Sequence, residues 1–126
     1  MCALCYLPGV SSQGDVSALF RVGDYEGTVV ECSVGAWQSK VVRDHPEIEG
    51  REREVESAVV DPEIVLQDRD YPDRKHHIRR TPDGLYLKVV AAYAYMDGVA
   101  EGTVVTAFLQ SRLRRGDTIL YVRARG

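Results

Sequence analysis

The second half of the chain alternates between polar and apolar residues, and this two-residue period constrains the fold more than any other feature of the sequence. The period predicts four β-strands, at about residues 75–81, 85–96, 103–110 and 118–125. Between them lie Pro82-Asp83, a loop over residues 97–102 and a turn over residues 114–117, all with hairpin composition. We therefore expect an antiparallel meander.

The first half of the chain predicts short strands followed by helices. Two β-favouring runs, residues 19–22 and 28–34, flank a turn at residues 23–27. Trp37 and Val41 then fall four residues apart, on one face of a short helix that Pro46 should end near His45. A second helix is expected at about residues 46–60, before a turn that leads into Ile64-Val65-Leu66.

These elements predict one α+β domain over residues 1–126, in which two helices pack on one face of a four- to five-stranded antiparallel sheet. Residues 1–18 are expected to form a poorly ordered or edge segment. The apolar stretches are shorter than the roughly 20 residues of a membrane-spanning helix, and the N-terminus is a poor signal peptide. We expect a cytoplasmic protein with no membrane partner, and delivery into a second cell stays open.

Cysteine usage fits a reducing compartment. Cys2, Cys5 and Cys32 cannot all pair within the chain, and Cys2 and Cys5 lack a second ligand pair for zinc. We therefore expect neither a metal nor another cofactor.

The register of the predicted strands assigns residues to the two faces of the sheet. A two-residue loop at Pro82-Asp83 pairs Ile78 with Leu87 and His77 with Lys88, because paired residues share a face. The same reasoning pairs Ala107 with Tyr93 and Val122 with Leu109. All hairpins then agree on one apolar face, which the helices would cover and on which His76 falls.

The opposite face is expected to be open and basic. It carries His77, Arg79, Tyr86, Lys88, Thr106, Phe108, Arg112, Tyr121, Arg123 and Arg125. An exposed sheet face is ordinarily polar, which accounts for the arginines but not for the aromatic residues between them. Cations interleaved with aromatic rings suit phosphate contact and base stacking in single-stranded nucleic acid.

The charge distribution agrees with a polyanion-binding second half. Residues 1–70 hold 6 Lys/Arg and 14 Asp/Glu, a net charge of −8, whereas residues 71–126 hold 10 and 5, a net charge of +5.

The sequence lacks the motifs of several enzyme classes, and this limits the reactions that the protein could catalyse. The sequence has no GxSxG, no Gly-rich phosphate loop before a helix, no HExxH and no carboxylate cluster on the basic strands. Metal-independent RNA cleavage remains, in which the 2′-hydroxyl attacks the adjacent phosphate with the help of a base, an acid and cations. The predicted register groups His77, Arg79, Lys88 and Arg112, and it leaves Thr106 about 20 Å from the row of Lys88 at the usual rise per residue.

Several short motifs resemble, in order and spacing, the phage-associated barnase–EndoU–colicin–RelE-like nuclease domains. They are Trp37-Gln-Ser-Lys-Val-Val-Arg-Asp-His-Pro-Glu, Asp61-Pro-Glu-Ile, Leu87-Lys-Val-Val and Val105-Thr-Ala-Phe. The resemblance implies a barnase/RelE-like fold and a metal-independent ribonuclease in phage or toxin settings. It also implies site roles for His45, Lys88, Thr106 and either Arg79 or Arg80. The chain has His76-His77 where the pattern has aromatic residues, which leaves the general base open.

We therefore expect an endoribonuclease with His77 or His45 as proton carrier, Arg79 and Lys88 on the phosphate, and Thr106 positioning the RNA. The remaining open-face residues would bind the substrate: Tyr86, Phe108, Arg112, Tyr121 and Arg123. The alternative is a non-catalytic module that holds RNA or an acidic partner on the same face. A third possibility is that the acidic first half is a docking surface for an immunity or antitoxin partner, as in toxin–immunity pairs. His45 also has an alternative role, as a helix cap.

Overall fold

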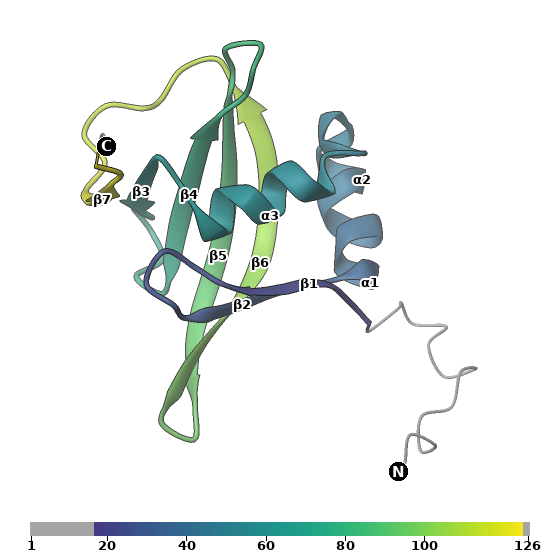
Figure 1. Ribbon diagram of the computed structural model, residues 1–126, viewed down its shortest axis with the longest axis vertical. Helices are drawn as coiled ribbons and strands as arrows, with labels where there is room; N and C mark the ends of the chain where they lie inside the picture. The colour runs from purple at the N-terminus through teal and green to yellow at the C-terminus, as the bar shows by residue number, and fades with distance from the viewer. Residues whose placement is uncertain (1–16, 125–126) are drawn as a thin grey trace.

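A computed structural model of the chain describes residues 17–124 and shows an α+β fold (Figure 1). The strands are β1 (Ala18–Gly23), β2 (Val29–Ser33), β3 (Ile64–Gln67), β4 (Arg74–Arg80), β5 (Tyr86–Met96), β6 (Val99–Gln110) and β7 (Ile119–Val122). The helices are α1 (Val34–Ala36), α2 (Val42–Asp44) and α3 (Glu52–Val60), with a π-helical turn at Trp37–Val41 and a 3-10 turn at Pro46–Ile48. Cys2, Cys5 and most of the expected N-terminal segment lie outside the described residues.

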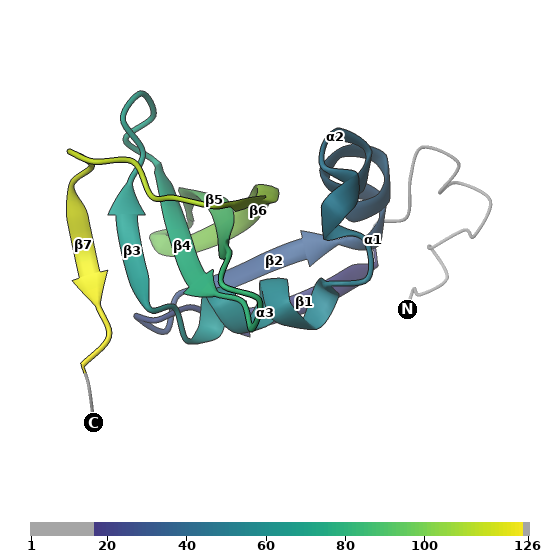
Figure 2. The ribbon, with the colours of Figure 1, turned by 90° about the horizontal axis from the view of Figure 1, so that it is seen from above.

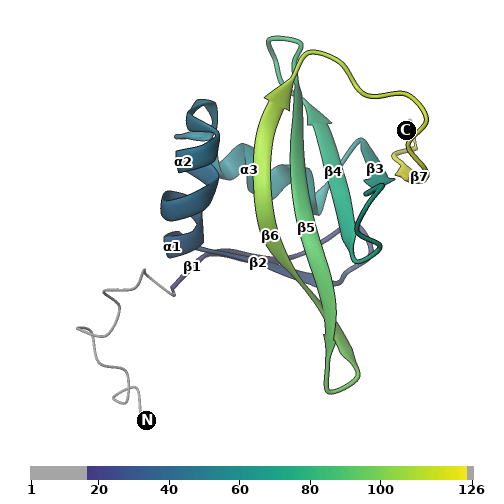
Figure 3. The same ribbon diagram turned by 180° about the vertical axis from the view of Figure 1, so that it is seen from behind.

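The α+β prediction is confirmed, but the predicted sheet of four to five antiparallel strands is wrong. The sheet has seven strands in the order β1-β2-β6-β5-β4-β3-β7, and β2 runs parallel to β6. Gly102 lies in this parallel ladder and leaves room for the Tyr93 ring of β5 and for Val30 of β2, since a Cβ there would lie 2.9 Å from Cε2 of Tyr93 and 3.0 Å from Cγ2 of Val30. β2 and the helical segment beside it occupy the outer side of β6 (Figure 3).

Because the outer side of β6 is occupied, β7 cannot complete the predicted meander. β7 instead pairs antiparallel with β3 at the far edge of the sheet (Figure 2). Val122 faces Ile64 there, and the predicted pairing of Val122 with Leu109 is wrong.

The first helical segment ends at the residue that the sequence predicts, whereas the second helix is shorter than predicted. Ser33 begins the first helical segment by accepting a hydrogen bond from the Ala36 backbone N–H at 3.0 Å, and the segment ends at His45, before Pro46. The expected helix over residues 46–60 is interrupted because Gly50 adopts φ +85, so α3 starts only at Glu52.

One apolar core lies between α3, the first helical segment and the sheet (Figures 1 and 2). Its fully buried members are Val30, Cys32, Val41, Ile48, Val55, Ala58, Val59, Val89, Ala91 and Ala107. Burial raises the pKa of the Cys32 thiol to about 11, so this cysteine is an apolar packing residue.

The β4–β5 turn has three residues, not two, and this changes the assignment of faces. Thr81 and Leu85 close the turn through a 2.9 Å backbone hydrogen bond, and Gly84 takes φ +86. Ile78 therefore pairs with Lys88, and His77 with Val89. A one-residue shift moves every side chain to the other face. The prediction that His76 lies in the core and His77 on the open face is wrong: their places are exchanged.

The β5–β6 register also differs from the prediction. Asp97 (φ 54) and Gly98 (φ 81) form a two-residue turn, so β6 begins at Val99 and Tyr93 pairs with Gly102 rather than Ala107. A bulge follows between Val90 and Ala91 on this ladder. Thr106 consequently pairs with Val90, two residues from Lys88, and the predicted separation of about 20 Å is wrong.

His77 belongs to a buried polar network on the α3 side of the sheet. Its Nδ1 lies 3.2 Å from the Val89 carbonyl oxygen and its Nε2 lies 3.1 Å from the Tyr93 hydroxyl. Tyr93 donates to Asp24 at 2.6 Å, and Asp24 accepts two backbone N–H groups of the β1–β2 turn. Burial lowers the pKa of His77 to about 4, so the imidazole is neutral and structural at neutral pH.

This burial predicts a pH-dependent stability. The unfolded chain protonates His77 near pH 6.5, the folded chain only near pH 4, so the unfolded state binds more protons between these values. The contribution of His77 is fully present above pH 6.5 and is lost as the pH falls to 4, by up to about 3 kcal/mol. Thermal unfolding at pH 7.5 and pH 5 should show a smaller loss of stability in a His77→Asn variant than in the parent. Equal losses in the parent and His77→Asn would contradict this assignment.

Candidate active site

Three rows of side chains cross β4, β5 and β6 on the face turned away from α3. Paired residues share a face, so the register fixes the members of each row. The rows are His76, Val90 and Thr106; Ile78, Lys88 and Phe108; and Arg80, Tyr86 and Gln110. We call these nine residues the open face. Residues 111–118, called the strap below, run from β6 across the end of this face to β7 (Figure 3).

Lys88 is a buried cation at the centre of the open face. Its side chain lines a pocket of about 230 Å³ together with His76, Phe108, Gln110 and Arg114, and the residue is only 5% exposed. Its Nζ lies 5.7 Å from the centroid of the Phe108 ring, and no residue among 17–124 forms an ion pair or hydrogen bond with it. Burial lowers the pKa of Lys88, because desolvation disfavours the ammonium form. The carboxylates of Asp68, Asp70 and Asp117 also line the pocket, and the charges of Asp117 and Asp68 oppose this lowering without reversing it. An anion within reach of Nζ would add the ion pair that Lys88 lacks.

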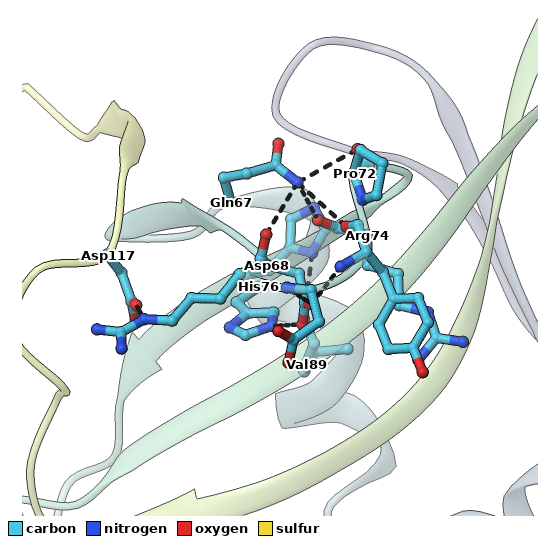
Figure 4. Close-up of polar contacts among 11 residues, drawn as sticks. Gln67, Asp68, Pro72, Arg74, His76, Val89 and Asp117 are labelled. Carbon is cyan, nitrogen blue, oxygen red and sulfur yellow. Dashed lines mark hydrogen bonds and ion pairs between the residues drawn. The ribbon is translucent and has the colours of Figure 1, made fainter.

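Asp68 and His76 form a hydrogen-bonded pair on the wall of the same pocket (Figure 4). Oδ1 of Asp68 lies 2.7 Å from Nε2 of His76, and Oδ2 accepts the backbone N–H groups of Asp70 and Tyr71. Burial opposes ionisation of Asp68, but the hydrogen bonds from His76 and the two amides outweigh it and lower the pKa. An ionised Asp68 therefore fixes the orientation of the His76 ring, whose Nδ1 is buried and lacks a hydrogen-bond partner within the described chain.

A second imidazole stands at the accessible edge of the open face. His45 follows α2, where Pro46 ends the helix, and its ring lies 5.1 Å from the Phe108 ring, centroid to centroid. Its Nδ1 is 3.6 Å from a Glu47 carboxylate oxygen, and about a third of the side chain is exposed. Phe108 thus contacts both His45 and Lys88, and the three residues form one continuous cluster.

The strap adds three cations to this face. Arg69 holds the strap through hydrogen bonds to the Asp117 carboxylate and to the Arg115 carbonyl oxygen. The exposed guanidinium groups of Arg112, Arg114 and Arg115 form no ion pair or hydrogen bond with any residue that the structure describes. Arg114 lines the Lys88 pocket with Arg69, and the carboxylates of Asp68, Asp70 and Asp117 line it as well. The free guanidinium groups of the strap are therefore the charges at that end of the sheet that remain available to a polyanion.

The structure brings together five residues that the sequence predicted for the site. Tyr86, Lys88, Thr106 and Phe108 lie on the open face, and His45 stacks on Phe108. Arg112 lies in the strap and does not line the Lys88 pocket.

Four other predicted residues do not reach this cluster. His77 is buried on the α3 side, and Arg79 donates to the carboxylate and the carbonyl oxygen of Asp61. Tyr121 packs against Tyr25, with ring centroids 4.8 Å apart, and Arg123 pairs with Asp61 and Glu63. The grouping of His77 and Arg79 with Lys88 is therefore wrong.

Sequence reasoning missed Asp68, His76, Gln110 and Arg114 as pocket residues. Gly84 is the local signal that could have found His76, because glycine directly after Pro82-Asp83 favours a three-residue turn. No local signal marks Asp68, since its place depends on the pairing of β3 with β4.

Comparisons with protein-family models, curated proteins and solved structures found no significant match to this chain. Within residues 17–124, no helix has the length and apolar character needed to cross a membrane. The same residues contain no group of three or more His, Cys, Asp or Glu side chains placed to hold a metal ion.

The unpaired charge in the pocket predicts that Lys88 lowers the stability of the protein. Replacement of Lys88 by Met keeps the length of the side chain and removes the buried ammonium, so the free energy of unfolding should rise by about 1–2 kcal/mol. Chemical denaturation measures this change. Lys75→Met is the matched control and should not stabilise, because the Lys75 ammonium pairs with Glu26 and lies over Tyr93. A Lys88→Met protein less stable than the parent would contradict the unpaired state of Lys88.

Proposed function

We propose that the protein is a metal-independent endoribonuclease whose active site is the Lys88 pocket with its two flanking imidazoles. The observation that carries the proposal is the buried ammonium of Lys88, which forms no ion pair or hydrogen bond within the described chain and lies beside the Asp68–His76 pair and the His45–Phe108 stack. A protein does not ordinarily keep such a charge unpaired, because its burial costs free energy. A phosphate group would offset that cost.

The cations divide into two roles in this proposal. Lys88 meets the phosphate under attack, where negative charge develops on the phosphorane in a low-dielectric pocket. Arg112, Arg114 and Arg115 contact neighbouring phosphates from the strap, at accessible positions that suit backbone binding without regard to sequence.

The His45 imidazole supplies the proton acceptor. As the 2′-oxygen forms its bond to phosphorus, its proton passes to His45; the bond from phosphorus to the 5′-oxygen then breaks, and the leaving oxygen takes a proton from solvent. His76 takes no part in proton transfer, because Asp68 holds its Nε2 and its Nδ1 is buried. About a third of the His45 side chain is exposed, so solvent reaches its ring. Thr106 lies in the row of His76 and has a hydroxyl without a described partner, so it can position the RNA.

A second candidate function is RNA binding without cleavage, on the same open face. It is favoured by the buried position of Nδ1 of His76, which has no access to a substrate proton in this conformation. The strap cations and Phe108 serve binding equally well in either case.

Nuclease assays on single-stranded RNA in EDTA separate the two functions. The parent protein should cleave, and Lys88→Met and His45→Ala should each reduce the rate by about 100-fold or more. Tyr121→Phe is the control and should cleave like the parent, since Tyr121 lies away from the pocket against Tyr25.

Two results would contradict the nuclease. Intact RNA after incubation with the parent protein would leave the binding module as the function if the RNA is retained at low salt. If Tyr121→Phe loses as much cleavage activity as Lys88→Met, the Lys88 pocket is not where cleavage occurs.

A further inference from the structure

A second pocket lies on the open face next to the Lys88 pocket, and its chemistry is different. It has a volume of about 230 Å³ and is lined mainly by the apolar side chains of Ile64, Ile78, Leu113 and Val122. The Tyr86 ring forms part of the wall, with the guanidinium carbon of Arg80 5.1 Å from the ring centroid. We call it the Tyr86 pocket.

The Tyr86 pocket and the Lys88 pocket share a wall made of three neighbouring pairs of residues. Ile78 pairs with Lys88 across β4 and β5, Tyr86 pairs with Gln110 across β5 and β6, and Leu113 precedes Arg114 in the strap. The first member of each pair lines the Tyr86 pocket and the second lines the Lys88 pocket. Because the side chains of paired residues begin only about 4.5–5.5 Å apart, the two pockets adjoin.

The lining of the Tyr86 pocket is mainly apolar. Its charged groups are the Glu63 carboxylate, which accepts the Arg80 backbone N–H at 2.9 Å and pairs with Arg123, and the Arg80 guanidinium, which lies over the Tyr86 ring. The apolar walls and the aromatic ring suit a flat ring system. The volume is below the roughly 300–1,000 Å³ of pockets that hold drug-sized ligands, so one ring system fits better than a whole nucleotide.

We propose that the Tyr86 pocket is a nucleobase subsite, which binds the base of the nucleotide whose phosphate occupies the Lys88 pocket. This proposal depends on the proposed function in one respect, namely that the ligand is RNA. A base bound between Tyr86 and Leu113 places its own backbone at the strap, where Arg114 reaches the Lys88 pocket. With this subsite, the open face binds unpaired nucleotides in preference to paired ones, because a paired base leaves its stack only at an energetic cost.

Binding to RNA analogues that cannot be cleaved tests this subsite. The probes are a 2′-O-methyl oligonucleotide and a matched oligonucleotide with the same number of phosphates but abasic residues, and the readout is fluorescence anisotropy. The parent protein should bind the base-containing probe at least about tenfold more tightly, since stacking on an aromatic side chain contributes about 1–3 kcal/mol per base. Tyr86→Leu keeps an apolar wall without the ring and should bind both probes with nearly equal affinity. Tyr95→Leu, at the exposed tip of the β5–β6 hairpin, is the matched control and should keep the full preference.

The outcomes separate this subsite from the nuclease. Base preference that depends on Tyr86, in a protein that leaves cleavable RNA intact, supports the subsite and overturns only the nuclease. Equal binding of the two probes by the parent protein, no binding of either probe, or an undiminished preference in Tyr86→Leu would overturn the subsite even if the protein cleaves RNA.

Discussion

The three-residue turn between β4 and β5 decides which chemistry each face of the sheet carries. Gly84 accepts φ +86 without the strain of a side chain, and it thereby adds one residue to the Pro82-Asp83 turn. The extra residue places Lys88, His76 and Phe108 on one face and His77 on the other. A two-residue turn would bury His76 and expose His77, and the Asp68–His76 pair could not form on the open face.

The tight turn at Asp97-Gly98 and the bulge beside Val90 together decide which residues of β5 and β6 lie opposite each other. The turn lengthens β5 and β6 and sets their register, and the bulge then adjusts it by one residue before Thr106. Thr106 reaches the row of His76 only because both features are present. The open face is thus built from backbone geometry at a few turn residues.

Local elements were predictable from the sequence, and pairings between distant elements were not. The β1–β2 hairpin, the helix end before Pro46 and the positions of β4 to β6 depend on turn residues and on periodicity, which act over a few residues. The pairing of β2 with β6 and of β7 with β3 depends on which strand edges remain free after the rest of the sheet forms. The same division applies to the site. Lys88, Phe108 and Thr106 were found from alternation, and Asp68 and Arg114 were missed because β3 and the strap bring them in from a distance.

The chemical nature of the reaction products tests the proposed site most directly. A metal-independent site with the His45 imidazole and the Lys88 ammonium around one phosphate uses the 2′-hydroxyl of RNA as its nucleophile, so cleavage in EDTA should leave a 2′,3′-cyclic phosphate that mass spectrometry detects. A single 2′-deoxy nucleotide at the cleaved position should block the cut at that position. Products with a 5′-phosphate, or unchanged cleavage at the deoxy position, would contradict it.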